Sequence, residues 1–130
     1  MSSKKILIID DDADFVESMK ITLESKSYKV FSAKDKQEGI ETIGRIMPDL
    51  IIMDVMLEKM CDGFDLSRKV KADEKYKNIP ILMITAIGEK TGFEFSTACG
   101  DEAWLPVDDY AKKPIKPEEL LAKIGKLLSK

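Results

Sequence analysis

The chain has 130 residues, with 21 basic and 24 acidic side chains, a formal net charge of −3 and no histidine. This length suits a single domain with a sizeable core, and the charge balance is that of an ordinary globular protein. The absence of histidine excludes Ser-His-Asp and Cys-His catalysis and His-containing zinc sites. The net charge gives no support to nucleic-acid binding by this domain, which would need a basic stripe.

The sequence shows no sign of export or of a membrane span. No apolar stretch approaches the length needed to cross a bilayer, and residues 1–5 lack the long apolar segment of a signal peptide. Cys61 and Cys99 are too few for a disulfide framework and have no metal-ligand spacing, so we expect ordinary thiols. These features predict a cytoplasmic protein that does not contact a membrane.

Strand-like and helix-like segments alternate through the first half of the chain. Residues 6–9 form a short apolar run, as expected of a strand buried on both faces of a parallel sheet. Asp12 is placed to cap the helix that follows. The apolar residues of that helix recur at nearly helical spacing, and they are Phe15, Met19, Ile21 and Leu23. Residues 28–33 are predicted as a strand, and residues 36–46 as an amphipathic helix with Ile40 and Ile43 inward.

The second half continues the alternation. A third strand runs through residues 50–53 to Asp54, and a helix is expected after Gly63. Residues 80–85 are predicted as a strand with Pro80 at its first position. We expect a short, irregular helix within residues 88–107, a short strand over residues 109–112 and a last helix from Pro117. This alternation predicts one α/β domain over residues 1–130, with helices on both faces of a parallel sheet.

Acidic residues gather where two of the predicted strands end. Asp10, Asp11 and Asp12 directly follow the first strand, and Asp54 ends the third. Carboxylates at the carboxyl ends of parallel strands point into the crevice where open α/β sheets bind ligands. Like charges repel one another there unless a cation joins them, and hard oxygen ligands suit Mg²⁺ or Mn²⁺. The sequence therefore predicts a divalent cation beside one special aspartate.

Four motifs of the chain resemble the signatures of response-regulator receiver domains. They occur in the family's order over essentially the whole chain, at residues 6–12, 48–54, 84–86 and 110–114. The resemblance implies a flavodoxin-like fold, with a five-stranded parallel sheet in the order 2-1-3-4-5 and about five helices. The chain departs from the family pattern in residues 57–63, which lack the usual proline.

The resemblance also implies a role for individual residues. Asp54 would be the phosphoacceptor and would contact Mg²⁺, with Asp11 as a direct metal ligand. Asp10 would act largely through a coordinated water, and the backbone carbonyl of Met56 would be a further ligand. Phosphoryl transfer to a carboxylate needs charge neutralisation and positioning more than acid-base help, which agrees with such a site.

Three further residues would complete the switch that the resemblance implies. Thr85 would hydrogen-bond a phosphoryl oxygen, Lys113 would pair with the phosphoryl group, and Tyr110 would be the aromatic switch residue. The phosphoryl group would come from a sensor histidine kinase or a histidine phosphotransfer protein. The chain would act on an unknown downstream protein as a signalling switch rather than an enzyme, although it would catalyse its own phosphorylation and dephosphorylation.

Other interpretations of these residues stay open at this stage. The three consecutive acids could only cap a helix, although capping explains one acid better than three. A haloacid-dehalogenase-like phosphatase also uses an aspartate nucleophile with Mg²⁺ after a first strand, but Asp14 stands where that class has Thr or Val. A binding module that keeps the fold without being phosphorylated is the third possibility.

Overall fold

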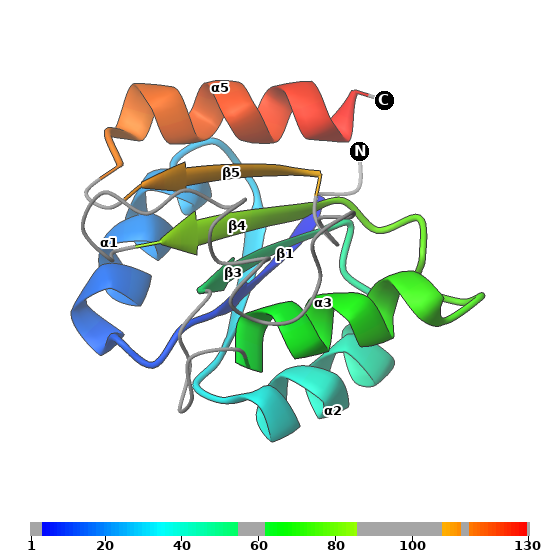
Figure 1. The fold of residues 1–130 in the computed structure, drawn as a ribbon. Coiled ribbons are helices and arrows are strands. Elements are labelled where there is room, and N and C mark those ends of the chain that lie inside the picture. The colour runs from blue at the N-terminus through cyan, green and yellow to red at the C-terminus, as the bar shows by residue number, and fades with distance from the viewer. Residues whose placement is uncertain (1–3, 55–61, 86–107, 113–114, 130) are drawn as a thin grey trace.

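The computed structural model describes residues 4–54, 62–85, 108–112 and 115–129, and within them a five-stranded sheet runs through the molecule (Figure 1). Every neighbouring pair of strands is parallel, and their order across the sheet is β2-β1-β3-β4-β5. The strands are β1 (Lys5–Ile9), β2 (Lys29–Ala33), β3 (Leu50–Asp54), β4 (Ile81–Thr85) and β5 (Asp109–Lys112). The predicted flavodoxin-like strand order is confirmed.

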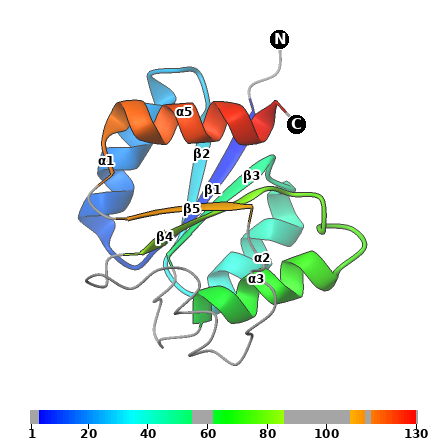
Figure 2. The same ribbon diagram turned by 45° about the horizontal axis from the view of Figure 1, so that its top comes forward.

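Helices cover both faces of this sheet, as the alternating sequence pattern predicted. The described helices are α1 (Ala13–Glu24), α2 (Lys36–Ile46), α3 (Asp62–Ala72) and α5 (Pro117–Leu128). Figures 1 and 2 show α1 and α5 on one face and α2 and α3 on the other. The irregular helix predicted within residues 88–107 lies outside the described residues, as do Cys61 and Cys99. None of the described helices is long and apolar enough to span a bilayer.

The strands divide their side chains between two apolar cores. In β1, Ile6 and Ile8 join the core beneath α1 and α5, whereas Leu7 and Ile9 join the core beneath α2 and α3. All four side chains are fully buried. Successive side chains of a strand point to opposite faces of the sheet, so an uninterrupted apolar run is what a strand covered on both faces needs.

One of the apolar residues at nearly helical spacing in the first helix does not share its buried side. The Ile21 side chain is 62% exposed, whereas Met19 and Leu23 are buried. Residues four apart lie on the same side of a helix, and a residue two positions from both points away from that side. The apolar side of α1 therefore follows Phe15, Met19 and Leu23.

Two aspartates fix the amino edge of the sheet, the edge at which the strands begin. Asp49 precedes β3, and its Oδ2 accepts a hydrogen bond of 2.7 Å from the backbone N–H of Lys5, the first residue of β1. Asp108 precedes β5, and its Oδ2 accepts one of 2.8 Å from the N–H of Ile81, the first residue of β4. Each carboxylate thus ties the start of its own strand to the start of the neighbouring one.

Lys71, near the end of α3, adds a third connection at this edge. Its Nζ donates to Oδ2 of Asp108 at 2.8 Å, to the carbonyl of Ile79 at 2.9 Å and to the carbonyl of Lys77 at 3.3 Å. The Lys71 side chain is only 14% exposed. One ammonium group therefore joins helix α3, the turn that follows it and the start of β5.

Gly39 lets α2 approach the sheet closely. A Cβ atom at this position would lie 2.9 Å from Cδ1 of Ile9 and 3.1 Å from Cδ2 of Leu66, and both of those side chains are buried. Close-packed cores resist added atoms, because neighbouring side chains must leave favoured rotamers to admit them. The absence of a side chain at Gly39 thus sets the spacing of α2, β1 and α3.

Replacing Lys71 with Met should lower the free energy of unfolding by about 1–3 kcal/mol, because the partly buried Asp108 carboxylate and the Ile79 carbonyl lose their donor. Lys77→Met is the matched control, since the Lys77 ammonium pairs with Glu74 at the exposed surface. That variant should change stability by less than about 0.5 kcal/mol. Urea denaturation measures both, and equal losses would contradict the proposed importance of Lys71.

Gly39→Leu should destabilise the fold by about 1–3 kcal/mol or more, because the larger side chain overpacks the space beside Ile9 and Leu66. Gly125→Leu makes the matched comparison. Gly125 lies within α5, and a Cβ there would meet no atom within 4 Å. This second variant should be more stable than the parent by about 0.5–1 kcal/mol, because leucine favours the helix more than glycine does. Thermal or urea unfolding measures both variants, and the free energy of unfolding should fall in Gly39→Leu and rise in Gly125→Leu.

Candidate functional site

The register of the sheet brings the predicted site residues to its carboxyl edge, the edge at which the strands end. Ile9 of β1 pairs with Met53 of β3. The next residue on each chain segment, Asp10 and Asp54, therefore lies at the same level of the sheet, on neighbouring strands. Asp54 in turn pairs with Ile84, the residue before Thr85. The strand ends that carry Asp10, Asp54 and Thr85 are therefore neighbours in the sheet, although they are far apart in sequence.

The last strand, β5, also ends at this edge. Thr85 pairs with Lys112, and Tyr110 pairs with Met83. Lys113 directly follows β5, so the chain leads from this edge to it, but Lys113 itself lies outside the described residues. Met56 also lies outside them. For Asp54, Thr85 and Tyr110 the structure describes the backbone position.

The three consecutive acids have three different surroundings. Asp10 is 4% exposed, its backbone N–H donates to the carbonyl of Ala33 at 3.0 Å, and its Oδ1 accepts from the N–H of Asp12 at 2.9 Å. Asp12 is the N-cap of α1, and its Oδ1 accepts from the N–H of Phe15 at 3.2 Å. Asp11 is exposed. The predicted cap at Asp12 is confirmed, and capping alone does not account for the buried Asp10.

An acidic cavity opens beside Asp10 and Asp11. Its volume is ≈ 440 Å³, and its lining includes four carboxylates, from Asp10, Asp11, Glu17 and Glu38, against one ammonium group, from Lys34. Such a surplus of negative charge favours the entry of a cation. Among the residues that the structure describes, no three His, Cys, Asp or Glu side chains are grouped as a metal site.

Glu38 also lines this cavity, although it was not among the predicted site residues. Asp35 caps α2, with its Oδ1 accepting from the N–H of Glu38 at 2.8 Å, and Glu38 Oε1 accepts from the N–H of Lys34 at 2.8 Å. The arrangement is similar to a capping box, with its acidic residue three positions after the cap, but Glu38 accepts from the N–H of the residue before the cap instead of from that of the cap itself. That spacing in the sequence would have placed the Glu38 carboxylate at the start of α2, next to the carboxyl edge.

Comparison with known proteins gives one consistent answer. A family model described as "Response regulator receiver domain" matches residues 6–125. Curated relatives include the DNA-binding dual master transcriptional regulator RpaA of Synechocystis sp., which is 38% identical over 95% of this chain and 48% of its own length. Another is the phosphate regulon transcriptional regulatory protein PhoB of Pseudomonas aeruginosa, 37% identical over 98% of this chain and 53% of its own length.

The solved structures agree with the curated relatives. The structure of chemotaxis protein CheY4 from Vibrio cholerae aligns with a TM-score of 0.81 and 28% identity, over 97% of this chain and 99% of that one. This protein is matched over almost its whole length, whereas the chain spans about half the length of RpaA and PhoB. The family match favours the predicted receiver over the phosphatase alternative.

The comparisons overturn one expectation about partners. The net charge gives no support to nucleic-acid binding, and no nucleic-acid partner was predicted for this domain. The relatives that match this chain are transcriptional regulators, and RpaA is described as DNA-binding. The prediction was wrong because the net charge of these 130 residues carries no information about the half of such regulators that this chain does not match.

Proposed function

The chain belongs to the response-regulator receiver domain family of two-component signalling, and we propose that Asp54 is the residue that accepts the phosphoryl group. The observation that carries this proposal is the pairing of Ile9 with Met53, which sets Asp54 beside the buried Asp10 at the carboxyl edge. Ligands of open α/β sheets bind at this edge. We further propose that residues 1–130 form a single receiver domain, which the family match over residues 6–125 supports.

The phosphoryl donor is proposed to lie outside these 130 residues. They contain no histidine, so the phosphohistidine would be supplied by a sensor histidine kinase or a histidine phosphotransfer protein. The receiver contributes its own site to the transfer, which makes it a switch that promotes its own phosphorylation and dephosphorylation. The switch is proposed to operate in the cytoplasm.

Asp10 and Asp11 suit the Mg²⁺ that this transfer requires. Mg²⁺ in proteins usually keeps several water ligands and needs only one or two carboxylates, so a group of three protein acids is not required. Asp10 is buried and held by its backbone, and Asp11 is adjacent to it and exposed to solvent. Asp54 and the backbone carbonyl of Met56 would add further oxygen ligands. The bound cation would neutralise charge on the transferring phosphoryl group.

Thr85 and Lys113 are proposed to complete the anion site, and Tyr110 to respond to it. Thr85 ends β4, directly beside β5, and the Lys113 ammonium would offset the negative charge of an aspartyl phosphate. A hydroxyl that moves toward a new anion changes the packing around it, and such local events can bias a larger surface. Tyr110 in β5 is the residue through which this change would reach that surface.

Control of DNA binding is the proposed output. RpaA and PhoB are transcriptional regulators that this chain matches over about half of their length. A protein with the same organisation would place DNA recognition in its other half and phosphorylation in the receiver.

Magnesium should stabilise the protein. At ten times its dissociation constant, a ligand that binds only the folded state adds about 1.4 kcal/mol to the free energy of unfolding. Asp11→Asn should remove most of this gain, because it removes a proposed metal ligand. Asp14→Asn, in the first turn of α1 but not in the lining of the cavity, should keep the gain. Thermal unfolding with and without millimolar Mg²⁺ measures the effect, and a gain unchanged in Asp11→Asn would contradict this metal site.

Incubation with acetyl phosphate and Mg²⁺ should add about 80 Da to the intact mass, the increment of one phosphoryl group. Asp54→Asn should abolish the gain. Asp49→Asn is the matched control, because Asp49 is the acid at the opposite end of the same strand, and its Oδ2 is held by the N–H of Lys5. This control should still be modified.

The same measurement tests the alternatives. No mass gain, either with small phosphodonors or with phosphorylated histidine kinases, would support a binding module that is not phosphorylated. Modification of the Asp54→Asn variant would show that another residue is the acceptor.

A further inference from the structure

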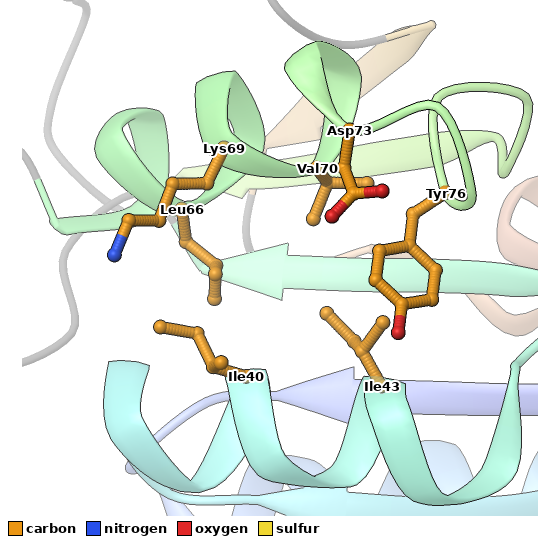
Figure 3. Close-up of a pocket in the computed structure, with 7 residues that line it drawn as sticks. All are labelled: Ile40, Ile43, Leu66, Lys69, Val70, Asp73 and Tyr76. Carbon is orange, nitrogen blue, oxygen red and sulfur yellow. The ribbon is translucent and has the colours of Figure 1, made fainter.

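A groove lies between α2 and α3, on the face of the sheet opposite α1 and α5 (Figures 1 and 3). Its volume is ≈ 260 Å³, and its apolar lining consists of Ile40 and Ile43 from α2 and Leu66 and Val70 from α3. The polar side chains that line it are Lys69, Asp73 and Tyr76. All seven residues belong to the part of the chain that the structure describes, and none is among the site residues proposed above.

One end of this groove combines a carboxylate with an aromatic ring. In Figure 3 the Asp73 carboxylate and the Tyr76 ring face the same space, above the apolar side chain of Ile43. The backbone N–H of Lys75 donates to Oδ1 of Asp73 at 2.8 Å, and this bond fixes the orientation of the carboxylate. The Tyr76 ring is half-buried, and it packs against the core beneath α2 and α3.

This combination suits an ammonium group. A carboxylate supplies a charge-assisted hydrogen bond, and the face of an aromatic ring attracts a cation. Among the described residues, no basic side chain forms an ion pair with Asp73. Lys69 lies toward the opposite end of the groove in Figure 3, Lys77 pairs with Glu74 at 3.0 Å, and Lys71 binds Asp108.

The size of the groove limits the ligand. Pockets for drug-sized molecules usually measure about 300–1,000 Å³, so this groove suits a smaller one. Four aliphatic side chains line its body, which favours an apolar group attached to the cation. We propose that the groove between α2 and α3 binds a small primary amine with an apolar body, with its ammonium group between Asp73 and Tyr76.

The proposed site is independent of phosphorylation. Its residues come from α2, α3 and the turn after α3, and neither Asp54 nor the acidic cavity contributes to it. The affinity of the groove for the amine should therefore be the same in the presence of EDTA and in the Asp54→Asn variant. Failure of the amine proposal is thus distinguishable from failure of the proposed phosphorylation.

Titration of the isotope-labelled protein with 2-phenylethylamine tests the proposal. We expect saturable amide shifts in residues 40–44 and 66–76, with a dissociation constant in the millimolar range or below. 2-Phenylethanol has the same apolar body without the charge, and it should bind about tenfold more weakly. The acidic cavity could also attract an amine, but millimolar Mg²⁺ should suppress shifts there and leave those in the groove.

Asp73→Asn should reduce the affinity for the amine about tenfold and leave that for the alcohol unchanged, because Asn keeps the side-chain acceptor for the N–H of Lys75 but loses the charge. Glu41→Gln is the matched control, since Glu41 is an exposed acid of α2 that does not line the groove, and its replacement leaves the Lys77–Glu74 pair intact. Shifts confined to the acidic cavity, or equal affinity in Asp73→Asn, would overturn the proposal. If the amide shifts of the groove residues changed with protein concentration and not with amine concentration, the groove would instead be a contact between two copies of the chain.

Discussion

The parallel pairing of β1 with β3 is the constraint on which the rest of the molecule depends. Because Ile9 pairs with Met53, Asp10, which follows β1, and Asp54, which ends β3, lie at the same edge. A shift of this pairing by one residue would exchange the two faces of β1 and send Leu7 and Ile9 to the wrong core. Apolar packing therefore fixes the register, and the register brings the charged residues together.

Aspartates serve opposite purposes at the two edges of the sheet. At the amino edge, Asp49 and Asp108 accept hydrogen bonds from the first N–H groups of β1 and β4. At the carboxyl edge, Asp11 is exposed beside a cavity lined by three other carboxylates. The N–H donors at the amino edge are the first residues of strands, whereas those at the carboxyl edge belong to the segment and the helix that follow β1, where Asp12 donates to Asp10 and Phe15 donates to Asp12. The exposed carboxylate of Asp11 remains accessible to a cation.

The sequence predicted the elements that follow from simple periodicity. The apolar runs of β1, β3 and β4, the Asp12 cap of α1 and the proline that begins α5 are local features, so these strands and helices were found within one or two residues. The exposure of Ile21 was not predicted, because nearly helical spacing does not separate the buried side of a helix from its edge. Contacts that depend on tertiary structure were not predictable. The hydrogen bonds of Lys71 join residues up to 37 positions apart, and the groove beside Tyr76 exists only once α2 and α3 are packed together.

The three hydrogen bonds of Lys71 bear on how the molecule opens locally. One side chain joins the end of α3, the carbonyl of Ile79 and the carboxylate that holds the start of β4. Breaking these contacts one at a time leaves polar groups without partners, so the region is expected to open as a unit. Amide hydrogens at the beginnings of β4 and β5 would then exchange with solvent at similar rates. These rates would be slower than those of β2, the outer strand at the other side of the sheet. If β4 and β5 shift relative to each other, the movement would accordingly be larger at their carboxyl ends than at their starts, which these contacts hold together.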